Sequence, residues 1–200
     1  MYFVIVRVLS AIAHLLFRIR VKGAEHIPKT GGIILCSNHK SVIDPLLLLI
    51  KSKRKIYYMA KSELFTDHGR LAGWFLRKAG AFPVHRGTSD TESIKTALGV
   101  LRRGDILGIF PQGGCVRENE AGFKPKAGAA LIAGKARSPV LPVCIYCDGP
   151  VRLFRRITVR FGPPLSYEEL GFSEGTLRES RGATKILGQK VTQLLEEQHH

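Results

Sequence analysis

The sequence predicts a single α/β domain with a mostly parallel sheet flanked by helices, preceded by an N-terminal amphipathic, membrane-associating helix. Beyond residue 30, short β-branched runs alternate with amphipathic stretches, which is typical of this fold class. The chain has 200 residues, of which 44% are hydrophobic and 24% charged. That is enough for one well-filled core and short for two. Residues 1–19 stand apart because almost all of them are apolar.

The expected elements follow from hydrophobic periodicity and from the residues that end them. Ser166 and Glu169 predict a capping box that opens a short helix. Gly104 is expected to cap the C-terminal end of the helix predicted at 91–103. Pro142 has no N–H to donate, so it predicts an edge strand or a bulge near a ligand. Strands are predicted at 33–36, 56–59, 81–85, 106–110, 140–146 and 157–161, and helices at 45–51, 71–78, 91–103, 127–136 and 184–197.

Residues 1–22 are predicted to form a membrane-interface helix, and residues 23–200 the globular domain. The polar residues between Met1 and Ile19 fall at helical spacing and leave one narrow polar stripe. The apolar stretch is too short to cross a bilayer, which needs about 20 residues. Arg18, Arg20 and Lys22 follow it, where anionic headgroups attract each cation by about 1 kcal/mol. A helix docked on the core and a cleaved signal peptide are the alternatives.

The net charge of +15 and the pI near 10.1 call for an anionic partner: nucleic acid, a membrane surface, or an acidic or phosphorylated substrate. No nucleic-acid partner is expected, since no helix-turn-helix, zinc-finger or aromatic RNA-binding signature is present. Four cysteines without framework spacing favour a reducing compartment. Cys144 and Cys147 lie in an apolar run and are interpreted as structural, so no metal site is predicted.

His39 and Asp44 are the strongest candidates for chemistry. They follow the predicted strand 33–36, and loops at strand ends carry the sites of α/β proteins. An imidazole oriented by a carboxylate can take a proton from a hydroxyl. Asp44 before Pro45 also has the form of a helix N-cap, and one residue can serve both purposes.

Three later loops supply candidate substrate-binding residues. Arg86 ends the third strand and suits contact with a phosphate. The turn Gln112-Gly113-Gly114 would let a substrate approach backbone N–H groups. Lys124 and Lys126 precede a helix whose N-terminus adds its own attraction for anions.

Four blocks in this order resemble the motifs of the glycerolipid acyltransferase family, nearest to its short bacterial 1-acylglycerol-3-phosphate acyltransferases. They are His39-x4-Asp44, Gly80-x-Phe82-x3-Arg86, Phe110-Pro111-Gln112-Gly113 and Val140-Leu141-Pro142-Val143. The resemblance runs from about residue 20 to about residue 165. It implies that residues 23–200 form an acyltransferase domain.

The resemblance further implies transfer of a fatty acyl chain from acyl-carrier protein or acyl-CoA to the free hydroxyl of 1-acylglycerol 3-phosphate, giving phosphatidic acid. On that reading His39 is the general base, Asp44 orients it, and Arg86 lies near the acceptor phosphate. Backbone N–H groups at Gly113 and Gly114 are oxyanion candidates. No cofactor beyond the donor is implied. The expected partners are a phospholipid bilayer, at the cytoplasmic face of the cell membrane, and acyl-carrier protein.

The third block departs from the family pattern Phe-Pro-Glu-Gly-Thr-Arg. Gln112 loses a negative charge, Gly114 a hydroxyl and Cys115 a cation, and Arg117 is the candidate to replace that cation. Two alternatives therefore stay open at this stage: another acceptor, such as a different lysophospholipid or glycerol 3-phosphate, or an inactive membrane-bound lipid-binding relative.

Overall fold

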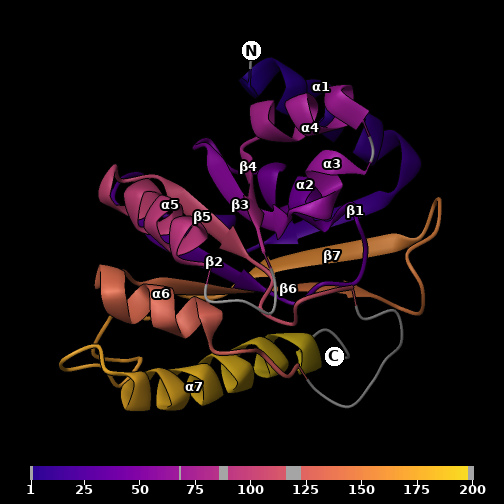
Figure 1. The fold of residues 1–200 in the computed structure, drawn as a ribbon. Coiled ribbons are helices and arrows are strands. Elements are labelled where there is room, and N and C mark those ends of the chain that lie inside the picture. Colours follow the sequence, from indigo (N-terminus) through magenta and orange to yellow (C-terminus); the bar gives the residue numbers. More distant parts are fainter. Residues whose placement is uncertain (1, 68, 86–89, 116–122, 198–200) are drawn as a thin grey trace.

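The computed structural model describes residues 2–67, 69–85, 90–115 and 123–197. They form three layers, in which one sheet lies between two layers of helices (Figure 1). The strands are β1 (Arg18–Lys22), β2 (Ile33–Ser37), β3 (Ile56–Lys61), β4 (Ala81–Val84), β5 (Ile106–Ile109), β6 (Val140–Cys147) and β7 (Arg156–Phe161). The helices are α1 (Tyr2–Leu16), η1 (Ala24–His26), α2 (Asp44–Leu49), α3 (Glu63–Thr66), α4 (Gly69–Lys78), α5 (Thr91–Arg102), α6 (Gly128–Ala136) and α7 (Leu177–Glu196).

The sheet has the order β1-β7-β6-β2-β5-β3-β4. The five strands from β6 to β4 are parallel, whereas β7 is antiparallel to β6 and β1 is parallel to β7. The carboxyl ends of β2, β5 and β6 therefore meet at the edge where β7 and β1 begin. The predicted mostly parallel α/β sheet is confirmed, and its carboxyl edge is where such folds hold their ligands.

Helices cover both faces of the sheet, and the core is divided accordingly. Side chains alternate along β2, so that Ile34 and Cys36 face α5, α6 and α7 while Ile33 and Leu35 face α2. All five residues of β2 are buried, and seven of the eight in β6. Strands buried on both faces need such continuous apolar runs, which explains why these two were clear in the sequence.

The N-terminal segment differs from the prediction. Helix α1 ends at Leu16 and does not continue to residue 22 as predicted. Arg18–Lys22 is instead an edge strand whose register sets Arg18 opposite Arg156 of β7. The alternation Arg-Ile-Arg-Val-Lys has the period of a strand, and the sheet satisfies its backbone. Helix α1 buries Val6 and Ala13 against the protein. No helix in the described part of the chain is long and apolar enough to cross a membrane.

Two helix starts were also misplaced. Helix α7 begins at Leu177 instead of residue 184, because Thr176 and Glu179 form a capping box that the sequence analysis missed. The Ser166–Glu169 box does form, with hydrogen bonds of 2.7 and 3.2 Å, but it closes a turn and not a helix. Gly104 follows α5 at φ 78° and donates to the carbonyl of Leu101, as a C-cap glycine does.

Pro142 lies in an interior strand, so the edge-strand alternative is wrong. The register shows a bulge beside Pro142, in the segment that follows β7 and not in β6 itself. That a ligand lies nearby stays a prediction. Val140 pairs with Leu165 and Val143 with Phe161, so three steps along β6 oppose four along its partner. The irregular pairing leaves no ladder bond that requires a Pro142 N–H, while its carbonyl accepts from Gly162 at 2.8 Å.

Replacement of Gly32, just before β2, tests the packing of α5 on the sheet. A Cβ at Gly32 would lie 2.2 Å from the carbonyl oxygen of Leu101, so Gly32→Ala should lower the free energy of unfolding by roughly 1–3 kcal/mol. Among the described residues nothing lies within 4 Å of a Cβ at Gly182 on α7. The matched change Gly182→Ala should raise stability by roughly 0.5–1 kcal/mol. Urea unfolding measures both, and equal effects would contradict the packing.

Candidate active site

The described site centres on His39 and Asp44, in the loop between β2 and α2. The imidazole Nδ1 donates to Asp44 Oδ2 over 2.8 Å. The same oxygen accepts the backbone N–H groups of Lys40 at 2.6 Å and Ser41 at 2.9 Å, and the Asp44 side chain is fully buried. Because Nδ1 carries the donated proton, Nε2 is left as the nitrogen that can accept one. This is the arrangement of a general base and its orienting carboxylate.

Asp44 does not cap its helix. It is the first residue of α2, the N-cap is Ile43, and Pro45 falls in the first turn. The helix start predicted at Asp44 and Pro45 is thus confirmed, but the carboxylate binds the loop before the helix instead of the helix N-terminus. The capping alternative was wrong because the ring of His39 and two loop amides occupy Oδ2.

Two neighbours of His39, which the sequence analysis did not single out, tie its loop to β6. Buried Asn38 donates from Nδ2 to the carbonyl of Ile145 at 2.9 Å and accepts that residue's N–H at 2.7 Å. Lys40 Nζ donates to the carbonyl of Cys147 at 2.9 Å. The position of the base is therefore set by the neighbouring strand, and a polar residue directly after a buried strand was the available signal.

The third block lies against His39. The ring of Phe110 stacks on the imidazole, with centroids 4.3 Å apart and planes inclined by 23°. Gln112 Oε1 accepts the backbone N–H of His39 over 2.8 Å. An amide oxygen accepts this bond as a carboxylate oxygen would, so Gln112 holds the backbone of His39 without a negative charge.

Cys115 occupies the other side of the imidazole. Its Sγ lies 3.4 Å from Nε2 of His39, and the side chain is exposed. The thiol thus stands where any group that gives a proton to Nε2 would have to approach. Of the three departures in the third block, this one touches the reacting nitrogen directly.

Only some of the glycines and lysines predicted to bind substrate lie near His39. Gly113 adopts φ 80° and donates its N–H to the carbonyl of Phe110 at 3.3 Å, so that N–H belongs to the turn and Gly114 is the remaining oxyanion candidate. Lys126 lies over the turn: a Cβ added to Gly113 would be 3.1 Å from its Nζ. Lys124 instead lines a groove along α7, away from His39. Arg86 and Arg117 lie outside the described residues.

A cavity of about 390 Å³ adjoins the dyad, since Phe110 and Gly113 contribute to its wall. Its lining is more apolar than polar, and its polar side chains are those of His85, Asp90, Ser93 and Lys126. The site thus combines a proton acceptor, an apolar space and a cation, which suits a substrate that is both apolar and anionic. The aliphatic residues of the lining are Met59, Val84, Ile94, Ile109, Leu131 and Ile132.

Comparison with known proteins agrees with this geometry. The sequence model described as Acyltransferase matches residues 18–146, which include the dyad and the third block. The 1-acyl-sn-glycerol-3-phosphate acyltransferase of Bacillus subtilis is 31% identical over 97% of this chain and 96% of its own length. The chain belongs to the acyltransferase family.

Other relatives of this acyltransferase carry the same description. The Streptococcus pneumoniae protein is 34% identical over 75% of the chain, and the mouse alpha protein 32% over 76%; the matches span 59% and 56% of those two relatives. The crystal structure of the Thermotoga maritima enzyme PlsC superimposes with a TM-score of 0.70 at 21% identity, covering 97% of this chain and 81% of that one. This likeness shows the fold.

Alkylation should inactivate the acyltransferase through Cys115. Burial raises the pKa values of Cys36 and Cys144 to about 12 and also raises that of Cys147, so these thiols stay protonated and inaccessible at neutral pH. Iodoacetamide at pH 7.5 should modify Cys115 first and abolish acyl transfer, because the adduct stands against Nε2 of His39. Peptide mass mapping locates the adduct.

Cys115→Ser is the control for this experiment. It should keep its activity in the presence of iodoacetamide. Inactivation of the serine variant at the wild-type rate would show that another residue is responsible.

Proposed function

We propose that the protein transfers a fatty acyl chain from acyl-carrier protein or acyl-CoA to the free hydroxyl of 1-acylglycerol 3-phosphate, giving phosphatidic acid for phospholipid synthesis. The 2.8 Å contact between His39 and Asp44 carries the proposal, because it leaves Nε2 as the proton acceptor. The two bacterial relatives are both 1-acyl-sn-glycerol-3-phosphate acyltransferases, which supports the choice of acceptor.

In the proposed reaction His39 takes the proton of the acceptor hydroxyl as that oxygen attacks the thioester carbonyl. Asp44 stabilises the imidazolium that forms, and the Gly114 N–H is the group proposed to donate to the oxyanion. The intermediate then expels the thiolate, which takes the proton back from His39. Lys126 and Arg86 are proposed to bind the acceptor phosphate. The hydrogen bond from the His39 N–H to Gln112 supports an active enzyme over an inactive relative, because it holds the base in place.

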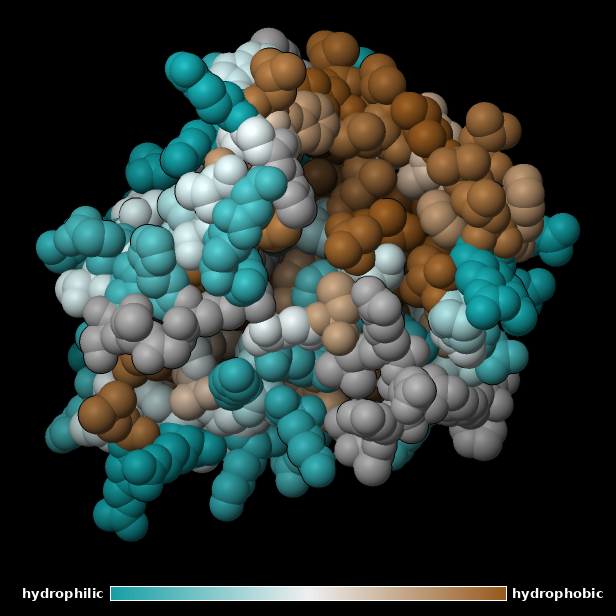
Figure 2. Space-filling model, turned by 45° about the vertical axis from the view of Figure 1, so that its right-hand side comes forward, coloured by the Kyte–Doolittle hydropathy of each residue, from teal (hydrophilic) through white to brown (hydrophobic). Residues whose placement is uncertain are grey.

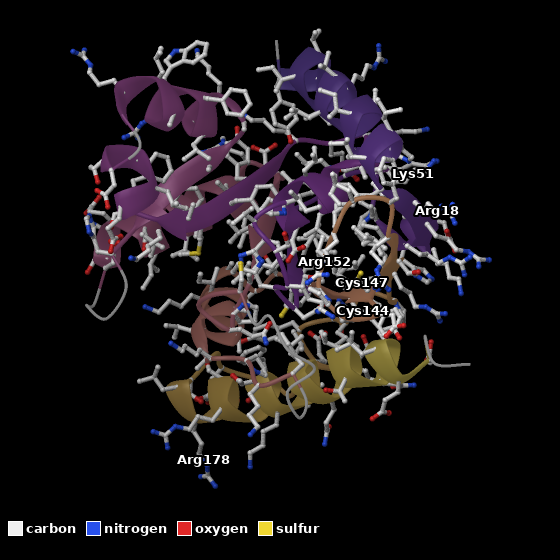
Figure 3. All side chains as sticks on the ribbon, turned by 90° about the vertical axis from the view of Figure 1, so that its right-hand side faces the viewer. Arg18, Lys51, Cys144, Cys147, Arg152 and Arg178 are labelled. Carbon is white, nitrogen blue, oxygen red and sulfur yellow. The ribbon has the colours of Figure 1, made fainter. Side chains whose placement is uncertain are left out.

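Membrane attachment is part of the proposal, as a peripheral or monotopic protein on the cytoplasmic face. Helix α1 exposes one apolar face, and α4 exposes three large apolar side chains at the same end of the molecule (Figures 1 and 3). Figure 2 shows apolar surface gathered over that end. An exposed apolar surface of this kind is typical of an interaction site. The exposed residues are Phe3, Val4, Val8, Ile12 and Leu15 of α1, and Leu71, Trp74 and Phe75 of α4.

Transfer of labelled palmitoyl tests the reaction. Both donors are combined with 1-acylglycerol 3-phosphate, glycerol 3-phosphate and lysophosphatidylcholine as acceptors. His39→Ala should lower kcat by about 10²–10⁴-fold through loss of the base, and Asp44→Asn should also lower it, whereas His14→Ala on exposed α1 should not. Product formation by His39→Ala at the wild-type rate would rule out the mechanism, and no product with any pair would favour a lipid-binding relative.

Trp74 reports on the membrane face, since it is the single tryptophan of the chain and its side chain is 52% exposed. Addition of phospholipid vesicles should shift its emission to shorter wavelength and reduce quenching by acrylamide, because the indole leaves water. The control is Trp74→Phe, which should bind vesicles in a sedimentation assay without the signal. If the Trp74 emission stayed unchanged in protein that sediments with vesicles, α4 would not be part of the surface that contacts the membrane.

A further inference from the structure

The loop between β6 and β7 carries apolar side chains between arginines, in the run Arg152-Leu153-Phe154-Arg155-Arg156. Leu153 is 58% exposed and Phe154 67%. Phe154 adopts φ 63°, a left-handed conformation that is unfavourable for a bulky residue and is held only where its surroundings require it. Here its N–H donates to the carbonyl of Leu16 over 2.7 Å. The apolar tip is thereby fixed beside the C-terminal end of α1.

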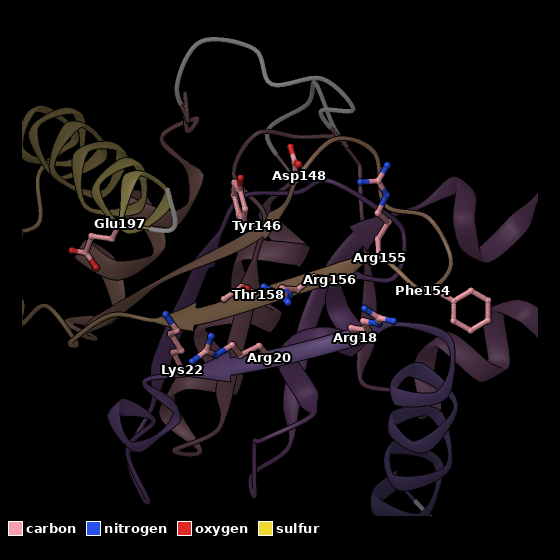
Figure 4. A pocket seen from close by; sticks show the side chains of 10 residues that line it. All are labelled: Arg18, Arg20, Lys22, Tyr146, Asp148, Phe154, Arg155, Arg156, Thr158 and Glu197. Atoms are coloured by element: carbon pink, nitrogen blue, oxygen red, sulfur yellow. The ribbon is translucent and has the colours of Figure 1, made fainter. Parts of the chain in front are cut away.

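A basic groove of about 600 Å³ opens next to this tip (Figure 4). Alternation along β1 puts Arg18, Arg20 and Lys22 on one face, and the register sets Arg18 directly opposite Arg156. Like charges opposite each other on neighbouring strands destabilise a sheet. An anion bound between the two guanidinium groups would offset this repulsion. Arg155 adds a third cation at the same end of the groove.

The two ends of the groove differ in compensation. At the far end Lys22 lies opposite Arg160, which forms an ion pair with Glu197. At the near end, beside the tip, neither Arg18, Arg155 nor Arg156 forms a salt bridge within the described ranges, although Asp148 also lines the groove. The uncompensated positive charge therefore lies where the exposed apolar side chains are.

We propose that this loop is a second membrane contact, in which Leu153 and Phe154 enter the bilayer interface while Arg18, Arg155 and Arg156 bind the phosphates of anionic phospholipids. The inference extends the membrane attachment of the proposed function. An apolar tip flanked by cations matches the boundary between acyl chains and anionic headgroups. A soluble phosphate would explain the arginines but not the exposed Phe154 ring beside them.

The contact also orients the catalytic edge. Lys40, next to the base, donates to the carbonyls of Cys147 at 2.9 Å and Gly149 at 3.5 Å, at the start of the same loop. The first residues of β1 and β7 lie at the edge where β2 delivers His39. A bilayer held by this loop would therefore meet the edge of the sheet from which a lipid acceptor must reach the base.

Partitioning of the full chain into vesicles tests the inference, with phosphatidylglycerol vesicles compared with phosphatidylcholine vesicles. Phe154→Ser should weaken binding to both about tenfold. Arg155→Gln combined with Arg156→Gln should weaken binding to phosphatidylglycerol about twenty-five-fold, from about fivefold for each cation, and to phosphatidylcholine less than twofold. The matched controls are Leu177→Ser and Arg178→Gln, exposed residues of α7 on the far side (Figure 3), each expected to change binding less than twofold.

The inference would be overturned if Phe154→Ser bound vesicles like Leu177→Ser, or if the double arginine variant bound phosphatidylglycerol like wild type. A soluble phosphate compound, 3′,5′-ADP, is added as a competitor. Full displacement of the wild-type protein from vesicles at submillimolar concentration would also overturn the inference, because it would assign the groove to a soluble phosphate. Circular dichroism excludes unfolding of the variants. Acyl transfer is measured separately in detergent. Loss of transfer with intact vesicle binding would count against the proposed reaction and not against this contact.

Discussion

The whole site depends on one buried oxygen, Oδ2 of Asp44. It accepts three hydrogen bonds, two from loop amides and one from the imidazole of His39. A buried carboxylate without partners would be strongly unfavourable, so the loop must close around it for the chain to fold. The same closure turns Nε2 of His39 outward. Folding and chemistry thus have a common requirement, and a substitution at Asp44 affects both.

The order of the strands explains why distant segments meet at His39. Strand β2 lies between β6 and β5, so the residues that follow all three strands converge at one edge. From β6 come the peptide groups that bind Asn38 and Lys40, and after β5 come Phe110 and Gln112. Because the base is held from both sides, the altered third block changes the surroundings of Nε2 without releasing the ring. Cys115 is the part of that change that an acceptor would meet first.

Sequence periodicity predicted the buried elements well and the exposed ones poorly. All six predicted strands are present. Short continuous or alternating apolar runs fit few structures other than buried strands, which explains why these strands could be predicted. Strand β1 was missed because Arg18, Arg20 and Lys22 fit a basic helix end as well as a strand edge. Spacing placed His39 with Asp44, since a short loop limits their separation. Residue spacing could not show which of Lys124 and Lys126 lies at the site, because only the path of the loop before α6 decides which lysine faces Gly113.

The structure also shows that two alternatives for the N-terminus are compatible. Helix α1 is docked, since Val6 and Ala13 are buried, and it still presents a broad apolar face to solvent. Only one residue, Phe17, separates it from β1, which is hydrogen-bonded into the sheet. A helix attached in this way cannot move independently of the sheet edge that carries His39. On the proposed membrane contact, the depth of His39 relative to the bilayer is therefore set by the sheet and not by a flexible linker.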